Sequence, residues 1–149
     1  MPTSSPDPFN LRRFVREQER DYAQALSELR AGRKKTHWIW YILPQMTGLG
    51  SSEMSEYFGV TGPAEARAYL AHPVLGRRLV ECVEAISAHV GVQAAVILGS
   101  LDAIKYESCL TLFAAVAVGD SIYARALRQH FAGTPDQRTL ELIGQAPPT

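Results

Sequence analysis

Helical spacing of apolar residues, interrupted by glycine and proline, is the feature of this sequence that most limits its fold. Residues 11–29 place their large apolar side chains mostly on one helical face. The opposite face would carry the charged residues Arg12, Arg13, Arg16, Glu17, Glu19 and Arg20. Asn10 can cap this helix and Gly32 can end it. Because similar segments follow along the chain, the sequence predicts an all-α fold.

Start and stop signals divide the remaining chain into further helices. Helices are expected over residues 61–71, 74–91, 102–118, 120–133 and 134–144. For the last of these, Thr134, Pro135 and Gln137 match a capping box with Thr134 as the N-cap. We therefore expect about six to eight helices. They would form a single compact multi-helix domain over residues 9–144, between flexible tails at 1–8 and 145–149.

Length and composition restrict the class of protein. A chain of 149 residues, 46% hydrophobic and 20% charged, suits one globular domain with a real core. Its formal net charge of zero argues against bulk attraction to nucleic acid or to an anionic membrane. No signal peptide or membrane span is recognisable, so the expected location is the cytoplasm. Cys82 and Cys109 lie in apolar segments and are expected to be buried; no metal or other cofactor is predicted.

An aromatic block over residues 34–45 contains both tryptophans of the chain. Its apolar run from Thr36 to Leu43 lacks clear alternation and suits either a strand or a short buried helix. We favour a helix capped by Thr36 and ended by Pro44, because the neighbouring segments are helical in pattern. A glycine-containing loop is expected over residues 44–53.

Polar groups fringe this block and make it a candidate ligand site. Lys34 supplies a charge for phosphate or carboxylate, and His37 can move protons near neutral pH. Trp38 and Trp40 offer faces for stacking, and Gln45 adds an amide. The alternative is structural: the tryptophans anchor the core, His37 bonds a backbone carbonyl, and the lysines are solvated. The residue types alone leave both interpretations open.

A second candidate lies on the helix expected to start near Asp102. Its polar residues Asp102, Lys105, Ser108 and Thr111 follow one another at intervals of three. This spacing predicts one slowly drifting polar stripe along the helix. The alternative is a solvated face, with Asp102 as a first-turn acid that suits the helix dipole. Ser108 and Thr111 are nevertheless poor helix formers within an apolar element, which indicates that something besides helix propensity holds them there.

Several blocks of the sequence resemble an uncharacterised bacterial family, catalogued as domain of unknown function 1810 and sometimes labelled calpastatin. The blocks are Asn10–Val15, Gly32–Trp40, Leu43–Gln45, Glu65–Gly76 and Asp102–Phe113. The resemblance covers nearly all of residues 9–143 and implies a mainly α-helical fold without an established activity. The calpastatin label does not fit, since a calpain inhibitor of that kind is a disordered repeat. A looser similarity is to NADAR domains, which act on ADP-ribose-type compounds and would use a carboxylate for glycosidic cleavage.

These features together predict a small-molecule site for a nucleotide or ADP-ribose-like ligand. The predicted catalytic residues are Asp102 and His37, and the predicted ligand-binding residues are Lys34, Trp38, Trp40, Gln45, Lys105 and Ser108. Both segments pair core-facing apolar residues with polar ones, so we expect them to share one partly hydrated cleft. The alternative is a non-enzymatic interaction or regulatory domain. Binding of nucleic acid is disfavoured, because the chain has no basic helix.

Overall fold

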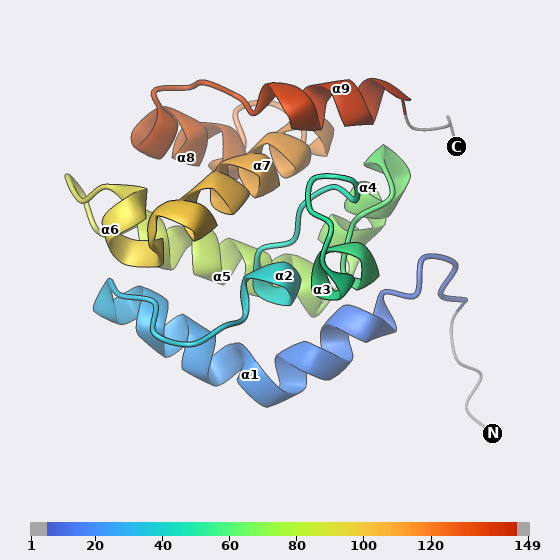
Figure 1. Cartoon of the computed structure of the whole chain (residues 1–149), viewed down its shortest axis with the longest axis horizontal. Helices are drawn as coiled ribbons and strands as arrows, with labels where there is room; N and C mark the ends of the chain where they lie inside the picture. The colour runs from blue at the N-terminus through green and yellow to red at the C-terminus, as the bar shows by residue number, and fades with distance from the viewer. Residues whose placement is uncertain (1–5, 146–149) are drawn as a thin grey trace.

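The computed structural model describes residues 6–145, which fold into nine helices (Figure 1). They are α1 (Arg12–Ala31), α2 (Ile39–Ile42), α3 (Glu53–Tyr57), α4 (Pro63–Ala71), α5 (Leu75–Ser87), α6 (Ala94–Leu98), α7 (Ser100–Val116), α8 (Ile122–Phe131) and α9 (Gln137–Gln145). Within this part of the chain, extended pairing is limited to one isolated bridge between Met46 and Val60. The predicted all-α fold is confirmed. The count exceeds six to eight because α2, α3 and α6 are helices of only four or five residues.

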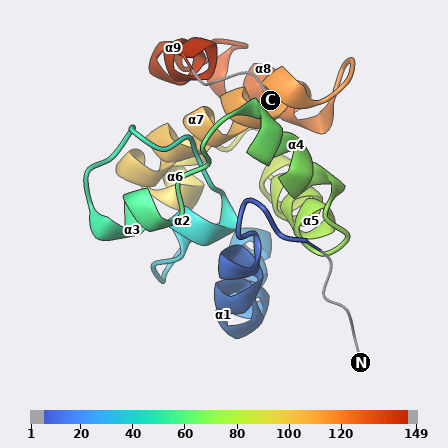
Figure 2. The ribbon, with the colours of Figure 1, turned by 90° about the vertical axis from the view of Figure 1, so that its right-hand side faces the viewer.

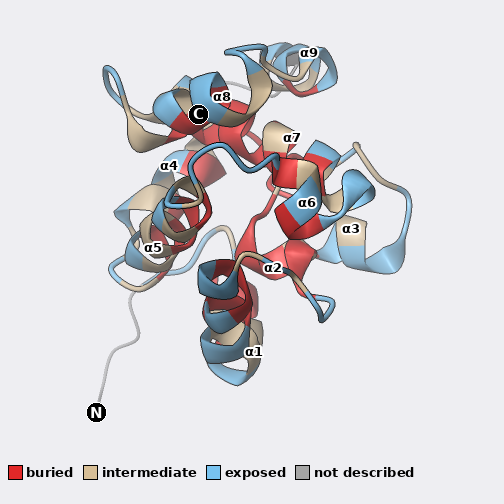
Figure 3. Ribbon diagram, turned by 90° about the vertical axis from the view of Figure 1, so that its left-hand side faces the viewer, coloured by how far each residue is buried: buried red, intermediate tan, exposed pale blue. Residues whose placement is uncertain are grey.

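Helix α7 lies at the centre of the arrangement. It packs against α4, α6, α8 and α9, while α5 packs against α1, α4 and α8. Figures 1 and 2 show α1 on one side of the molecule and α8 and α9 on the opposite side, with α7 between them. Figure 3 shows the buried faces of the surrounding helices turned toward the middle. A helix in this position must be apolar on several faces.

The sequence of α7 meets that requirement. Its residues Tyr106, Cys109, Leu110, Leu112 and Phe113 are fully buried. Ser108 and Thr111 are buried as well, at 3% and 2% exposure, so this end of the polar stripe does not form a solvated face. Each hydroxyl donates to the carbonyl four residues earlier, on Ile104 and Glu107 respectively. Backbone bonding of this kind satisfies a buried hydroxyl inside a helix.

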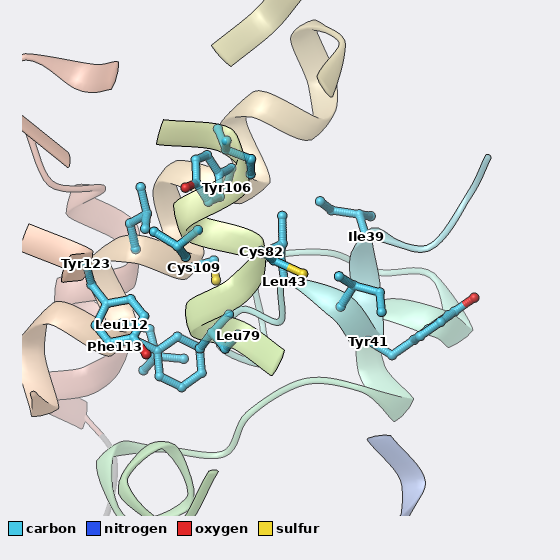
Figure 4. Close-up of a cluster of buried hydrophobic side chains, with 14 of the residues drawn as sticks. Ile39, Tyr41, Leu43, Leu79, Cys82, Tyr106, Cys109, Leu112, Phe113 and Tyr123 are labelled. Carbon is cyan, nitrogen blue, oxygen red and sulfur yellow. The ribbon is translucent and has the colours of Figure 1, made fainter. Parts of the chain in front are cut away.

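The two cysteines belong to the core, as the sequence predicts. Figure 4 shows Cys82 and Cys109 among the side chains of Leu79, Tyr106 and other buried hydrophobic residues. Burial raises the pKa of Cys82 to about 12 and that of Cys109 well above its ordinary value. The protonated thiol is the dominant form of both at neutral pH. Neither cysteine is therefore suited to act as a nucleophile or a metal ligand.

The ends of α1 show one correct and one wrong prediction. Gly32 ends the helix in the left-handed conformation, with φ 80°, as expected. A Cβ at Gly32 would also lie 3.1 Å from Cε1 of His89, so this position favours glycine twice over. The predicted N-cap Asn10 is wrong, because Leu11 occupies that position. The carboxylate of Asp7 instead accepts hydrogen bonds from the backbone N–H groups of Leu11 and Arg12.

Asp7 falls inside the segment expected to be a flexible tail. Residues 1–5 of that segment, and 146–149 of the C-terminal one, lie outside the described residues. The nine helices include none that is long and apolar enough to cross a membrane.

Candidate functional site

A buried carboxylate on α1 organises the aromatic block. Glu28 accepts hydrogen bonds from the backbone N–H groups of Lys35 and Thr36, from the Thr36 hydroxyl and from Nε1 of Trp38. Gln24 donates a further bond. Burial opposes the charge on Glu28, but these donors outweigh it and lower its pKa to about 2. Trp38, at 1% exposure, is consequently a core residue whose polar atom is already satisfied.

Lys34 is likewise engaged by its neighbours. Its backbone N–H donates to the carbonyl of Ile97 in α6 at 2.7 Å. The ammonium donates to the carbonyl of Thr36 at 2.6 Å and lies 2.9 Å from Oδ2 of Asp102. It also lies 4.9 Å from the centre of the Trp38 ring. With only 7% of its side chain exposed, Lys34 is positioned to fix Asp102 and not to reach a ligand.

Asp102, in the first turn of α7, connects the aromatic block to the polar stripe of α7. Its Oδ2 contacts Lys34, and its Oδ1 lies 3.3 Å from the ammonium of Lys105, one helical turn further along. Lys105 is more accessible, with 31% of its side chain exposed, and it stands 5.4 Å from the centre of the Trp40 ring. Trp40 is half-buried. Each lysine therefore bridges one tryptophan to the same carboxylate.

Two hollows meet at Lys105. The smaller, about 10 Å³, has room for no more than one water molecule. It is lined by Ile39, Trp40, Leu43, Gln45, Ser55, Phe58 and Lys105. The larger is a groove of about 400 Å³ between α7, the 45–55 segment and the start of α9. It is lined by Gln45, Leu49, Gly50, Ser55, Leu101, Ile104, Lys105, Ser108, Asp136 and Arg138. We call this larger hollow the α7 groove.

The fold brings together several of the predicted site residues. Gln45, Lys105 and Ser108 line the α7 groove, while Trp40 lines the adjoining hollow. Asp102 is held beside them through Lys105. The aromatic block and the start of the α7 stripe are thus neighbours, as the shared-cleft hypothesis requires.

His37, Lys34 and Trp38 line neither the α7 groove nor the adjoining hollow. His37 is exposed, and neither hollow at Lys105 includes it in its lining. Its backbone carbonyl accepts a 3.4 Å hydrogen bond from the Tyr41 hydroxyl, a contact that gives the imidazole no role. The predicted cleft therefore has to be corrected at His37, and also at Asp102, which contacts Lys105 but lines neither hollow. Lys34 and Trp38 lie beneath the site and support it.

Two charged groove residues were missed by the sequence analysis. Asp136 precedes α9 and Arg138 lies within it, far along the chain from Lys105. Asp136 accepts hydrogen bonds from the N–H and hydroxyl of Thr139, so Asp136 caps α9 in place of the predicted Thr134. Burial, followed by the charge of Asp136, raises the pKa of nearby Glu107. No local signal in the sequence assigns Asp136 or Arg138 to a site with Lys105.

Thr111 fixes the start of α9 against α7, which yields a direct prediction. Its hydroxyl accepts a 2.9 Å hydrogen bond from the backbone N–H of Asp136. Thr111→Val should lower the free energy of unfolding by about 1–3 kcal/mol, because that part-buried N–H loses its acceptor. Thr111→Ser keeps the hydroxyl and should cost less. Urea unfolding measures both, and equal stability of the two variants would contradict this role.

Other parts of the described chain are weaker candidates. A hollow of about 570 Å³ lies between residues 6–15 and α4, but two of its polar side chains already serve as caps. Asp7 caps α1, and Nδ1 of His72 accepts from the N–H groups of Val74 and Leu75. Over residues 6–145, no three His, Cys, Asp or Glu side chains are grouped so as to hold a metal ion.

Comparison with known proteins places the chain in a family. A search of curated proteins gives no significant match. The chain is similar to the conserved hypothetical protein Rv1873 from Mycobacterium tuberculosis, whose crystal structure has been solved, with 40% sequence identity and a TM-score of 0.90. The similarity covers 93% of this chain and 99% of that one. The profile of the family described as "Protein of unknown function (DUF1810)" matches residues 8–143, and the chain belongs to that family.

Proposed function

We propose that the α7 groove binds a small molecule that joins a flat ring to an anionic group, such as a nucleotide or an ADP-ribose-like compound. The observation that carries this proposal is the position of Lys105. It lies between the Trp40 ring and a groove of about 400 Å³, which is within the usual size range of ligand pockets, roughly 300–1,000 Å³. Trp40 lines the adjoining hollow of about 10 Å³, so a ring could stack on it once Lys105 moves from the indole toward an anion in the groove.

The rest of the groove suits a ligand of this kind. Arg138 provides a second cation, and Gln45 provides an amide that can both donate and accept. Within residues 6–145, the ion pair of Arg138 is an exposed contact to Glu141 at 3.5 Å, which costs little to break. Leu101 and Ile104 add apolar surface at the edge. The groove thus combines apolar walls with a few polar groups, as small-ligand sites generally do.

Asp102 is the residue we assign to proton handling if turnover occurs in this groove. Hydrolysis of a glycosidic bond generally uses carboxyl groups, and Asp102 is the carboxylate that contacts Lys105. Lys34 holds its other oxygen and fixes its orientation. Asp102 does not itself line the groove, but it lies 3.3 Å from Lys105, which does. We leave His37 out of the proposed chemistry, because it is exposed and lines neither the groove nor the adjoining hollow. Asp102→Asn should therefore reduce turnover more than it reduces binding.

The alternative function is that of a non-enzymatic interaction or regulatory domain. It is favoured by the exposure of two large apolar side chains at the groove edge, Leu101 at 75% and Ile104 at 59%. Exposed apolar surface that borders a groove commonly marks an interaction site. A small-molecule titration distinguishes the two functions.

The test uses tryptophan emission during titration with ADP-ribose, NAD and AMP. We expect the emission to change, because Trp40 lies at the site, and we expect no change in a Trp40→Phe variant. That variant retains Trp38, which Glu28 holds away from the groove. Calorimetry on both proteins should show that the phenylalanine variant still binds, although more weakly. Absence of any heat or emission change up to millimolar ligand would reject the proposal and favour the interaction domain.

A further inference from the structure

Lys105 covers the very surface on which the proposed ligand would stack. Its ammonium stands over the Trp40 ring, 5.4 Å from the ring centre. A cation in this position is attracted to the face of an indole by the quadrupole of the ring. Any ring that stacks on this face of Trp40 must first displace the ammonium.

The same lysine can leave this position at little cost. Its other partner is Asp102, one turn earlier on α7, at 3.3 Å. The contact is long for an ion pair, and a pair at this helical spacing stabilises a protein only weakly. Asp102 would not be left unpaired, because the buried Lys34 holds its other oxygen at 2.9 Å. Of the two lysines that contact Asp102, Lys34 is therefore fixed and Lys105 can change its position.

The α7 groove offers Lys105 an alternative side-chain position. It lines both the hollow at Trp40 and the α7 groove, so its side chain can reach an anion in the groove from the same backbone position. Its long, flexible stem carries a compact charge that suits phosphate. Lys34 cannot act in this way, because only 7% of its side chain is exposed.

We infer that Lys105 is a specificity gate, which opens the Trp40 face to ligands that carry an anion and disfavours uncharged ring compounds. This inference rests on the proposed function. An anionic ligand gives the displaced ammonium a new partner in the groove. A neutral nucleoside displaces the ammonium from the indole but offers it no anion as a new partner. The substrate class that follows is phosphorylated nucleotides, in preference to free nucleosides.

The test compares AMP with adenosine, which share the same ring. The wild-type protein should bind AMP at least about tenfold more tightly, a difference of about 1.4 kcal/mol. In Lys105→Ala, AMP binding should weaken while adenosine binding tightens, so that the ratio approaches one. Lys105→Gln should change the ratio in the same direction. Thermal melts check folding, which we expect to persist because Lys34 still neutralises Asp102.

Arg138→Ala is the matched control. Arg138 lines the groove but not the hollow that contains Trp40. Its removal should weaken AMP binding without improving adenosine binding. If adenosine affinity in Lys105→Ala is unchanged or lower, the gate is rejected and Lys105 is only an anion contact. If wild-type protein binds both ligands equally, the gate is rejected while the proposed site stands. If it binds neither ligand, the proposed nucleotide function fails and the gate fails with it.

Discussion

Replacing Glu28 by alanine is expected to lower the free energy of unfolding by about 3 kcal/mol or more. The substitution removes the acceptor of the Trp38 indole N–H and of two backbone N–H groups, on Lys35 and Thr36. A buried donor left unsatisfied costs about 1–3 kcal/mol, which applies in full to the indole N–H and in part to the two part-buried backbone N–H groups. Urea unfolding followed by circular dichroism measures the loss. We expect the aromatic block to lose its conformation first.

Acid titration provides an independent test of the same residue. The pKa of Glu28 is lowered from 4.5 to about 2 in the folded protein, so the unfolded chain takes up the proton first as the pH falls. The stability that this carboxylate contributes is therefore present above about pH 4.5 and is lost between about pH 4.5 and 2. Wild-type protein and Glu28→Gln should differ most at neutral pH and converge in that interval. A difference that is constant from pH 7 to pH 2 would contradict this explanation.

Glu28 also explains why the helix predicted at residues 36–43 is so short. Thr36 was expected to cap it, but the N–H and hydroxyl of Thr36 bind Glu28 instead. The helix consequently begins only at Ile39, and α2 spans four residues. The carboxylate lies on a different helix, eight residues earlier in the chain. Local pattern identified the helical tendency of the block, but it could not identify a partner outside the block.

The long helices were predictable because the apolar residues that face the core recur at the helical period in the sequence. Helices α1, α5 and α8 each present one apolar face to the core. Helix α1 ends next to the predicted Gly32, whereas α5 ends at Ser87, about one turn before the predicted Gly91. Helix α7 was harder to interpret, because it is covered by α4, α6, α8 and α9. Its serine and threonine are satisfied inside the core, which sequence spacing alone cannot distinguish from a polar surface stripe.

The candidate site was predictable only in part, for a similar reason. Lys34, Asp102 and Lys105 stood out as polar groups within apolar segments, and the fold joins them in one cluster. Their division of roles depends on burial, which fixes Lys34 and leaves Lys105 accessible. Arg138 enters the groove through the packing of α9 on α7, a long-range contact without a local signature.

A second large effect is expected at Arg13, which the sequence pattern assigned to the solvent face of α1. The structure buries it to 8% exposure. Its guanidinium donates to the carbonyls of Tyr57 and Gly59, which connects α1 to the end of α3 and the segment that follows it. Further bonds reach the carbonyls of Phe9 and Asn10. The arginine was misplaced because these acceptors lie on backbone that no side-chain pattern reveals.

The charge of Arg13 is balanced by Glu65, at 2.8 Å and 1% exposure. Removing one member of a buried ion pair leaves the other charge uncompensated and generally costs about 3–5 kcal/mol. We expect a loss of that size for Arg13→Met and for Glu65→Met. Urea unfolding provides the measurement. Arg16→Met, an exposed position on the same helix, is the control and should change stability by no more than about 0.5 kcal/mol.

The double variant Arg13→Met/Glu65→Met separates the pair from its surroundings. Because no lone charge remains, it should lose less stability than the sum of the single variants. It should still be less stable than wild type, since Thr61 donates both its N–H and its hydroxyl to Glu65. These donors, and the carbonyls that Arg13 satisfies, remain without partners in the double variant. Strict additivity would show that the two charges act separately, and that Arg13 stabilises the fold through its carbonyl acceptors and not through Glu65.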